Sequence, residues 1–293
     1  MFKKGIVILN AYIAYAGLKH LAERLQEEFH QHGIEIEITN NASILSYIDE
    51  DGKIKKKDLQ IDFIIYLDKD PYIAALLTKS GFRLFNKAEA VRLCDDKMLT
   101  YLSLSNHDIA MPKTITAPLC YSNKNDLSFI NHLERELTYP FVSKTNYGSQ
   151  GRGVCLIRNR EELIAKENEI AYLPRLYQTF IKSPYGIDHR LIVINKTVFA
   201  SMKRYNESGD FRSNIALGGK GEPFEPPASF IEMAQKAAEI LDLDYCGVDL
   251  LSGENGEPIL CEVNSNAFID GIEKATNMNV AGAYCEHIIK TIY

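Results

Sequence analysis

The sequence predicts a mixed α/β and α+β protein, in which a small amino-terminal lobe with a parallel sheet precedes a larger part built on antiparallel hairpins. Two observations predict this division. Over residues 1–85, short apolar runs alternate with helical patterns, which is typical of a parallel sheet covered by helices. From about residue 140 onward, strand-like runs follow one another across short polar turns, which indicates antiparallel pairing.

Apolar spacing predicts the elements of the amino-terminal lobe. Four short apolar or alternating runs predict strands, at residues 5–9, 34–38, 63–67 and 82–85. Residues 18–32 have helical spacing and end at Gly33, which suits a C-cap. Residues 70–80 predict a second helix with Pro71 in its first turn. The charged residues 49–58 predict a surface loop or hairpin.

The remaining elements follow in the same way. Residues 88–105 predict one helix, and residues 109–114 an extended linker, because Pro112 disfavours helix before it. Strands are predicted at residues 140–144, 154–157, 176–181, 190–194, 197–205, 245–251 and 258–263. Helices are predicted at residues 160–165, 229–241 and 280–293.

Composition argues against several classes of protein. The 293 residues include 33 Lys and Arg against 39 Asp and Glu, so the net charge of −6 does not favour a nucleic-acid binder. No apolar run approaches the ~20 residues of a membrane-spanning helix. The basic and apolar first ten residues predict a buried strand rather than a signal peptide. Six scattered cysteines without CxxC spacing favour reduced thiols in a cytoplasmic protein.

A glycine-rich turn over residues 147–153 follows a strand that ends at Lys144. Backbone N–H groups of such a turn can surround phosphates, and the lysine adds a positive charge. The spacing is neither that of a Walker A loop nor that of a Rossmann fingerprint. A flexible hairpin tip is the alternative interpretation.

Two acidic residues interrupt apolar strands near the carboxyl end of the chain. Asp249 lies on one strand, and Glu262 and Asn264 share a face of the next, so pairing of the two strands would bring all three together. Two carboxylates and one amide suit Mg²⁺ when substrate phosphates supply the other ligands. The alternative is that local backbone groups or arginines satisfy the carboxylates.

Several arginines accompany these features. Arg190 begins a strand, Arg204 ends another and Arg212 lies in the loop that follows. Converging arginines suit the stabilisation of a transferring phosphoryl group. Surface arginines in hairpin turns are the alternative.

The order of these motifs resembles the RimK-type ATP-grasp ligases, which include ATP-dependent glutamate ligases. The resemblance covers nearly the whole chain. It is carried by Lys97, Lys144 and the Gly148-Ser149-Gln150-Gly151 string, then by Asp188-His189-Arg190, Gly209-Asp210-Phe211-Arg212-Ser213-Asn214, Gly247-Val248-Asp249 and Glu262-Val263-Asn264.

This resemblance implies roles for individual residues. It implies that ATP is bound by Lys97, Lys144, Gly148, Ser149, Gln150, Gly151, Gly153, Gln178, Thr179, Phe180, Ile181, Asp188, Arg212, Ser213 and Asn214. Asp249, Glu262 and Asn264 would hold two Mg²⁺ ions, for which Mn²⁺ could substitute. Arg190 and Arg204 would stabilise an acyl phosphate. Thr179 stands where the family usually has Glu, although backbone contacts to adenine survive that change.

The resemblance also implies a domain plan and an activity. Residues 1–87 would precede an ATP-grasp module of residues 88–293, with a central lobe at roughly 115–180 and a catalytic lobe at roughly 181–293. The implied activity is amide formation through an acyl phosphate, adding glutamate or a similar amino acid to a small molecule, a peptide or a protein tail. Ligases of the lysine-biosynthesis or dipeptide type and a catalytically silent nucleotide-binding module are the alternatives. A homo-oligomer is compatible with the sequence.

Overall fold

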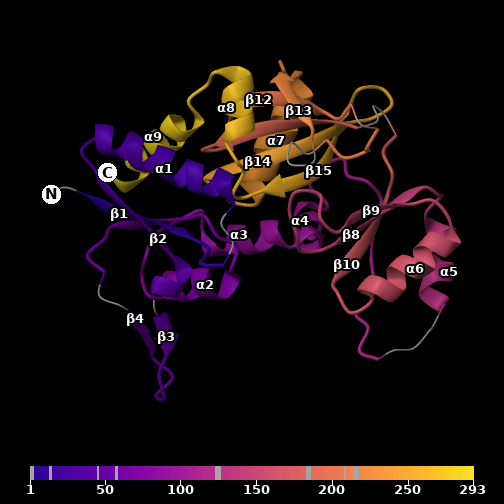
Figure 1. Ribbon diagram of the computed structural model, residues 1–293, viewed down its shortest axis with the longest axis horizontal. Coiled ribbons are helices and arrows are strands. Elements are labelled where there is room, and N and C mark those ends of the chain that lie inside the picture. The colour runs from indigo at the N-terminus through magenta and orange to yellow at the C-terminus, as the bar shows by residue number, and fades with distance from the viewer. Residues whose placement is uncertain are drawn as a thin grey trace.

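The computed structural model describes residues 3–12, 15–44, 46–56, 59–122, 127–182, 186–207, 209–213 and 218–293. Within these residues three main sheets follow one another along the chain (Figure 1). The first sheet is parallel and the other two are antiparallel. The predicted division into an α/β lobe and an α+β part is therefore confirmed.

The amino-terminal sheet has the order β2-β1-β5-β6, and its neighbouring strands pair in parallel among the described residues. Its strands are β1 (Lys4–Leu9), β2 (Glu35–Asn40), β5 (Phe63–Tyr66) and β6 (Leu84–Phe85). Helix α1 (Ala16–Gln31) buries Leu21, Leu25 and Phe29 against the core. Helix α2 (Pro71–Lys79) begins where the Asp70 carboxylate caps the backbone N–H groups of Tyr72 and Ile73.

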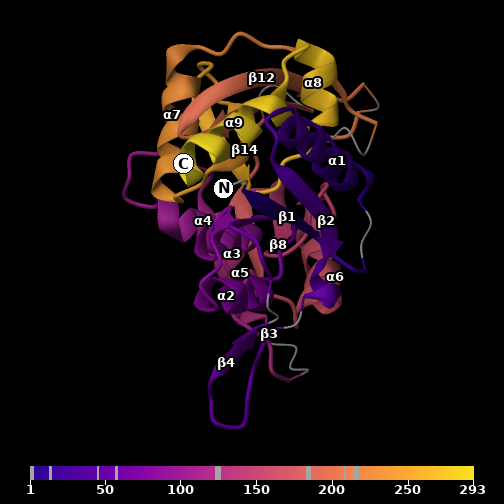
Figure 2. The same cartoon turned by 90° about the vertical axis from the view of Figure 1, so that its left-hand side faces the viewer.

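The charged segment predicted as a loop or hairpin is a hairpin. A short 3-10 helix, η1 (Asn41–Ser43), leads into β3 (Ser46–Ile48), which pairs with β4 (Ile54–Lys56). This hairpin projects away from the rest of the molecule, as Figure 2 shows.

One predicted helix is two. The sequence predicted a single helix over residues 88–105, but α3 (Ala88–Asp95) ends at Asp96 and α4 (Lys97–Leu104) starts directly after it. Asp96 is extended at ψ 108°, and its carboxylate accepts hydrogen bonds from the backbone of Met98 and Leu99. An aspartate that caps a new helix breaks the one before it. The break places Lys97 at the first position of α4.

The middle sheet has the order β7-β10-β8-β9 and is covered by two helices. Its strands are β7 (Thr114–Thr116), β8 (Phe141–Thr145), β9 (Val154–Ile157) and β10 (Arg175–Thr179). Its helices are α5 (Ser128–Glu136) and α6 (Arg160–Ile170). The predicted linker over residues 109–114 leads into β7, an edge strand on β10.

The carboxyl-terminal sheet has the order β13-β12-β11-β14-β15, and its neighbouring strands are antiparallel over the residues that the structure describes. Its strands are β11 (Ile187–Ile194), β12 (Thr197–Tyr205), β13 (Lys220–Pro223), β14 (Tyr245–Ser252) and β15 (Pro258–Asn264). Helix α7 (Ala228–Ile240) packs with Leu191 and Val193, on one face of β11. Helices α8 (Asp270–Thr276) and α9 (Val280–Ile292) pack with Ile192 and Ile194, on the other.

The amino-terminal and carboxyl-terminal sheets share one core. A single cluster of buried side chains runs from Val7 and Phe63 to Ile192 and Tyr284. Asn86, which follows β6, is buried and donates to the carbonyl oxygens of Tyr245 (2.7 Å) and Ser265 (2.8 Å). These contacts fix the carboxyl ends of the parallel strands against the second sheet.

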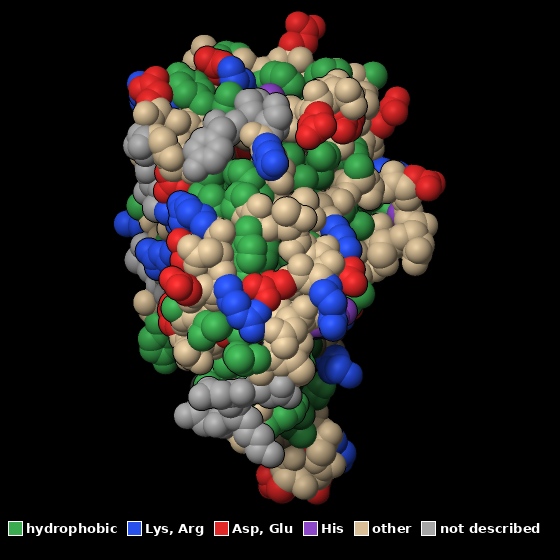
Figure 3. Space-filling view, turned by 90° about the vertical axis from the view of Figure 1, so that its right-hand side faces the viewer, with side chains coloured by type: hydrophobic (Ala, Val, Ile, Leu, Met, Phe, Trp, Pro, Cys, Tyr) green, Lys and Arg blue, Asp and Glu red, His purple; other side chains and the backbone are tan. Residues whose placement is uncertain are grey.

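Two further features concern the surface. In the described part of the chain, no helix is both long enough and apolar enough to cross a membrane. Lys and Arg side chains alternate with Asp and Glu on the face shown in Figure 3, without a field of one sign. On α6, for example, Lys166 pairs with Glu169.

Candidate functional site

A first cavity, of about 110 Å³, lies between the middle and carboxyl-terminal sheets. Strands of both sheets, the glycine-rich loop and the first residue of α4 supply its walls. It brings together fifteen of the residues predicted from the sequence: Lys97, Lys144, Gly148, Ser149, Gly151, Gln178, Thr179, Phe180, Ile181, Asp188, Arg204, Arg212, Ser213, Asp249 and Glu262.

The glycine-rich loop connects β8 to β9 and lies against two cations. The Lys97 ammonium donates to the carbonyl oxygen of Gly148 (2.8 Å), and Arg212 donates to that of Gly151 (3.1 Å). Gly153 has φ +73°, and a Cβ added there would lie 2.2 Å from Thr145 Oγ1. Glycine is therefore required at the base of the loop for both backbone conformation and space.

Two buried lysines lie beneath this loop. Burial lowers the pKa of Lys97, whereas Glu262, 3.8 Å away, acts to raise it. Burial also acts to lower the pKa of Lys144, but Tyr101, Cys261 and Glu262 outweigh it, so that this pKa rises. Lys144 is therefore held as a cation in the interior, where its charge attracts anions strongly.

Residues 178–181 border the same cavity, although β10 ends at Thr179, two residues before the end of the predicted strand. Gln178 is buried and donates from its side chain to Thr114 Oγ1 (2.8 Å), while Thr179 is exposed. The backbone N–H of Thr179 donates to the carbonyl oxygen of Lys113 (3.1 Å). The Phe180 ring meets that of Phe211 edge-on, with centroids 6.0 Å apart. The side chains of this edge therefore include two aromatic rings, which suit a flat aromatic base.

The carboxyl-terminal sheet aligns the charged residues in a row. Register places Arg190 opposite Asp249 and Asp249 opposite Glu262, so that these side chains share one face. Asp188 lies two residues before Arg190 and opposite Arg204. This is the face that Ile192 and Ile194 share, and it changes from apolar to charged beyond the cover of α8 and α9.

Asp249 accepts hydrogen bonds from two arginines and is 2% exposed. Arg190 forms a bidentate pair with it (2.8 and 2.7 Å), and Arg204 reaches it at 2.9 Å while also pairing with Asp188 at 2.6 Å. Burial alone would raise the pKa of Asp249, but Arg190 and Arg204 outweigh it and hold the pKa below its ordinary value of 3.8. Asp249 is therefore ionised at neutral pH.

Of the residues predicted as metal ligands, Glu262 and Asn264 have the carboxylate and amide oxygens that Mg²⁺ prefers. Both carboxylate oxygens of Asp249 already accept hydrogen bonds from arginines, as in the alternative interpretation of this residue. The Asn264 amide lies 3.4 Å from Asp249 Oδ2, and the Glu262 side chain is a quarter exposed. Among the described residues, no group of three His, Cys, Asp or Glu side chains could hold a metal unaided. A magnesium ion here would therefore need substrate oxygens as its remaining ligands.

A second cavity, of about 630 Å³, adjoins the first. It lies between the carboxyl end of the amino-terminal sheet, the glycine-rich loop and the turn after β15. Both cavities share Gly148, Ser149, Arg152, Arg204 and Glu262. Gln150, Arg190 and Asn264 line only the second cavity. Gly153 lines neither, and Asn214 lies outside the described residues.

Sequence reasoning missed the residues that the amino-terminal lobe and the loop add. Lys69 and Tyr15 line the second cavity, and Arg152 lines both. The Tyr15 hydroxyl lies 3.5 Å from Ser149 Oγ. A signal for Lys69 existed, because it follows a predicted parallel strand, and ligands of open parallel sheets bind at the carboxyl ends of strands.

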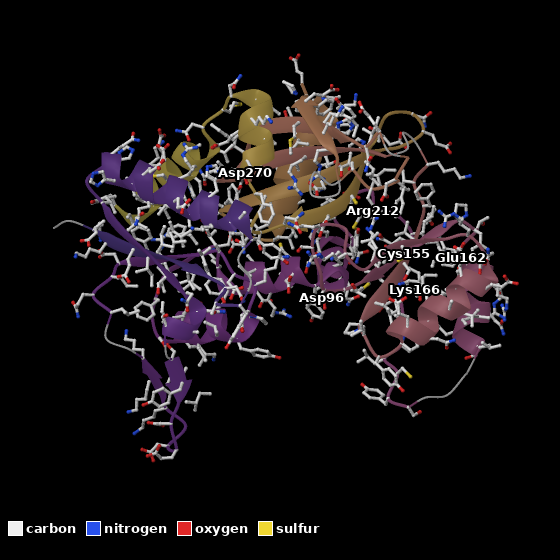
Figure 4. All side chains as sticks on the ribbon, in the orientation of Figure 1. Asp96, Cys155, Glu162, Lys166, Arg212 and Asp270 are labelled. Atoms are coloured by element: carbon white, nitrogen blue, oxygen red, sulfur yellow. The ribbon has the colours of Figure 1, made fainter. Side chains whose placement is uncertain are left out.

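Figure 4 shows how the two ends of this region lie. Arg212 is at the junction of the carboxyl-terminal sheet with β9, close to the strand that bears Cys155. Asp270 lies at the start of α8, toward the amino-terminal lobe. Residues from all three sheets, or from the segments that directly follow their strands, line the two cavities.

The sequence of this chain is similar to known proteins over most of its length. A family profile described as "RimK-like ATP-grasp domain" matches residues 94–288. N-acetylaspartylglutamate synthase A of Homo sapiens is 30% identical over 230 residues, which cover 77% of this chain and 57% of that protein. A probable alpha-L-glutamate ligase of Rhodopirellula baltica is 34% identical over 205 residues, 69% of this chain and 49% of that protein. The chain thus spans about half the length of these curated relatives.

The fold is also found among solved structures. The ATP-grasp ligase PsnB, complexed with a phosphomimetic variant of its minimal precursor, Mg and ADP, matches with a TM-score of 0.72. The match covers 99% of this chain and 98% of that one at 16% sequence identity, which is a likeness of fold.

Proposed function

This chain belongs to the RimK-like ATP-grasp family, and from that premise we propose that it is an ATP-dependent carboxylate–amine ligase. It forms an amide bond through an acyl phosphate and releases ADP and phosphate. One substrate is glutamate or a similar amino acid, in keeping with the names of the relatives in Homo sapiens and Rhodopirellula baltica.

The observation that carries this proposal is the contact between the two cavities. The first collects buried cations and the predicted nucleotide-binding residues, and the second has room for further substrates. Glu262 and Arg204 line both cavities. A phosphoryl group can therefore pass from a nucleotide in the first cavity to a carboxylate in the second without leaving the row of charged side chains.

The chemistry needs two displacements. A carboxylate oxygen attacks the γ-phosphorus of ATP, the bond to the β–γ bridging oxygen breaks, and ADP departs. An amine nitrogen then attacks the acyl carbon, phosphate leaves with the electron pair of the C–O bond, and the amine gives up a proton that the phosphate can accept. Lys97 and Lys144 neutralise the phosphate charge, and Arg190 and Arg204 lie where the acyl phosphate oxygens accumulate charge.

Other predicted residues keep their proposed roles. Gln178, Thr179, Phe180 and Ile181 border the adenine, Asp188 binds the ribose, and Arg212, Ser213 and Asn214 line the nucleotide site. Asp249, Glu262 and Asn264 would hold two Mg²⁺ ions, for which Mn²⁺ could substitute, and the metal would supply positive charge beside the transferring phosphoryl group. The glycine-rich loop from Gly148 to Gly153 closes over the phosphates and excludes water from the acyl phosphate.

The proposal also covers the domains, the acceptor and the oligomeric state. The chain divides at residue 87, and its later part has lobes at roughly 115–180 and 181–293. The acceptor is a small molecule, a peptide or a protein tail, and the chain can form a homo-oligomer. The six free cysteines suit a reducing compartment such as the cytoplasm.

The test is ADP release with Mg·ATP against a matrix of amino acids and carboxylic acids, with mass spectrometry of the products. We expect release that depends on one acid and one amine together, and a product heavier by the acid minus water. Replacement of Glu262 by Gln should abolish the release. ATP binding without turnover for every pair, including peptide acceptors, would contradict the ligase and favour a nucleotide-binding module.

A further inference from the structure

The second cavity holds more charged side chains than the proposed reaction uses. Its lining includes four cations and five carboxylates. The cations are Lys69, Arg152, Arg190 and Arg204, and the carboxylates are Asp68, Asp70, Asp95, Glu262 and Asp270. The partners of each group show which of them remain available for a substrate.

The carboxylates of the amino-terminal wall already accept hydrogen bonds. Asp68 is buried and accepts from the side-chain amides of Asn10 (3.1 Å) and Asn41 (2.7 Å) and from the backbone N–H of Lys69 (2.7 Å). Asp70 caps α2. A carboxylate has about four acceptor positions, so Asp68 has little capacity left for a ligand.

The remaining carboxylates have other partners. Asp270 pairs with His20, and Asp95 pairs with Lys69 at 3.1 Å. Glu262 faces Lys97 and belongs to the proposed metal site. The wall is therefore acidic in composition, but its carboxylates are engaged within the protein.

Two of the four cations are equally engaged. Arg190 and Arg204 are held by Asp249 and Asp188 in buried pairs, and Arg204 is 3% exposed. They can stabilise charge close to the reacting atoms, but their orientation is fixed by those carboxylates. Lys69 and Arg152 are the cations that remain.

Lys69 is placed rigidly at its backbone and loosely at its tip. The carbonyl oxygen of Asp68, directly before it, accepts a hydrogen bond from Asn266 (3.0 Å), which ties this loop to the turn after Asn264. The side chain of Lys69 is one third exposed and has a single ion pair, with Asp95. An ammonium group has three donors, so it can hold Asp95 and a ligand together.

Arg152 belongs to the glycine-rich loop and lines both cavities. It is exposed, and its guanidinium forms no hydrogen bond or ion pair with any of the described residues. Its backbone N–H donates to the carbonyl oxygen of Ser149 (3.1 Å), so the residue belongs to the turn itself. A guanidinium in this position is suited to a bidentate contact with a carboxylate.

We propose that Lys69 and Arg152 form a recognition site for the unreacting carboxylates of a dicarboxylic amino acid such as glutamate. The two cations come from the amino-terminal lobe and from the loop, and both line the same cavity of about 630 Å³. An amino acid with two carboxylates can bridge them and leave its amine toward Arg190 and Glu262. This inference rests on the proposed ligase function and assigns its substrate charge to named residues.

The test is calorimetric binding of L-glutamate and of L-glutamine, its neutral isostere, to the full chain loaded with Mg·ADP. We expect the wild type to prefer glutamate about tenfold or more, because a hydrogen bond to a charged group contributes about 1.5–3 kcal/mol. The Lys69→Met and Arg152→Gln variants should each weaken glutamate binding about tenfold, and Lys69→Arg should retain it. Lys53→Met, at the exposed turn of the β3–β4 hairpin, is the matched control.

Several outcomes would overturn the assignment. Equal binding of the two amino acids to the wild type, binding of neither, or an unchanged preference in both variants would each do so. If Arg152→Gln weakens Mg·ADP rather than glutamate, Arg152 belongs to the nucleotide site and the pair is rejected. A chain that releases ADP only with neutral or basic amino acids would keep the ligase proposal and lose this one.

Discussion

Asp249 is the residue on which the most charge converges. Two arginine side chains donate to its buried carboxylate, so an Asp249→Asn substitution leaves Arg190 without its counter-ion and Arg204 with Asp188 alone. We expect a loss of about 3–5 kcal/mol in the free energy of unfolding, measured by urea denaturation at neutral pH. Asp242→Asn, at an exposed pair with Lys87, should cost only about 0–1 kcal/mol. A similar cost for both variants would contradict this account.

The same residue predicts a dependence of stability on pH. The folded-state pKa of Asp249 lies below its ordinary value of 3.8, so the unfolded chain binds its proton first as pH falls. Its contribution is complete above that value and is lost as pH falls through the folded pKa. The stability difference between wild type and Asp249→Asn should therefore shrink in acid, and denaturation midpoints measured from neutral pH downward would check this. A difference that grows in acid would refute the assignment.

Single residues were predictable from the sequence where their neighbours were unusual for their setting. Asp249 and Glu262 were found because acidic residues interrupt apolar strands, and Lys144 because a glycine-rich turn follows it. The engagement of Arg190 and Arg204 with Asp249 was not predictable, because it depends on the register of β11, β12 and β14. Asn264 could be placed on the same face as Glu262 from alternation along one strand alone.

At the scale of elements, the base of the glycine-rich loop offers a matched pair of glycines. Gly153→Ala would bring a Cβ to 2.2 Å from Thr145 Oγ1, whereas Gly52→Ala, at nearly the same φ of +74°, meets nothing within 4 Å. Both variants carry the strain of a left-handed alanine, roughly 1–2 kcal/mol. Only Gly153→Ala should also weaken ATP binding, by about tenfold, in a calorimetric titration. Equal ATP affinity in the two variants would remove the loop from the nucleotide site.

Strands and hairpins were the elements that sequence patterns predicted best, because alternation and polar turns are local signals. The single helix predicted at residues 88–105 was wrong, since the pair of aspartates before Lys97 supplied a cap that apolar spacing does not reveal. Helices α5 and α8 and the edge strands β7 and β13 were not predicted. They are short, and β7 and β13 each pair with only one neighbouring strand.

At the scale of the whole molecule, Asn86 joins the amino-terminal sheet to the carboxyl-terminal one. Its side chain donates to two carbonyl oxygens and accepts from the backbone N–H groups of Asp244 (2.7 Å) and Tyr245 (3.0 Å). Asn86→Ala would remove four hydrogen bonds to backbone groups, three of them buried, and we expect a loss of about 3 kcal/mol in unfolding free energy. Faster cleavage in limited proteolysis should accompany it. Asn255→Ala, in an exposed turn, should change neither, and a silent Asn86→Ala would contradict the role.

The shared core was beyond sequence reasoning for a physical reason. Apolar spacing shows that α1 and α9 each have a buried face, but not that the two faces meet. Contacts between residues more than two hundred and fifty positions apart leave no local pattern. The location of the second cavity, which depends on how the lobes pack, was unpredictable for the same reason.

The packing of α9 on α1 has a consequence for biosynthesis. The first strands and α1 leave the ribosome well before α9, yet their apolar face is completed by Val280, Tyr284 and Ile288 of that helix. Until then the nascent amino-terminal segment exposes surface that in the finished protein is covered. Molecular chaperones that bind exposed apolar segments would therefore associate with this nascent chain until α9 has emerged from the ribosome.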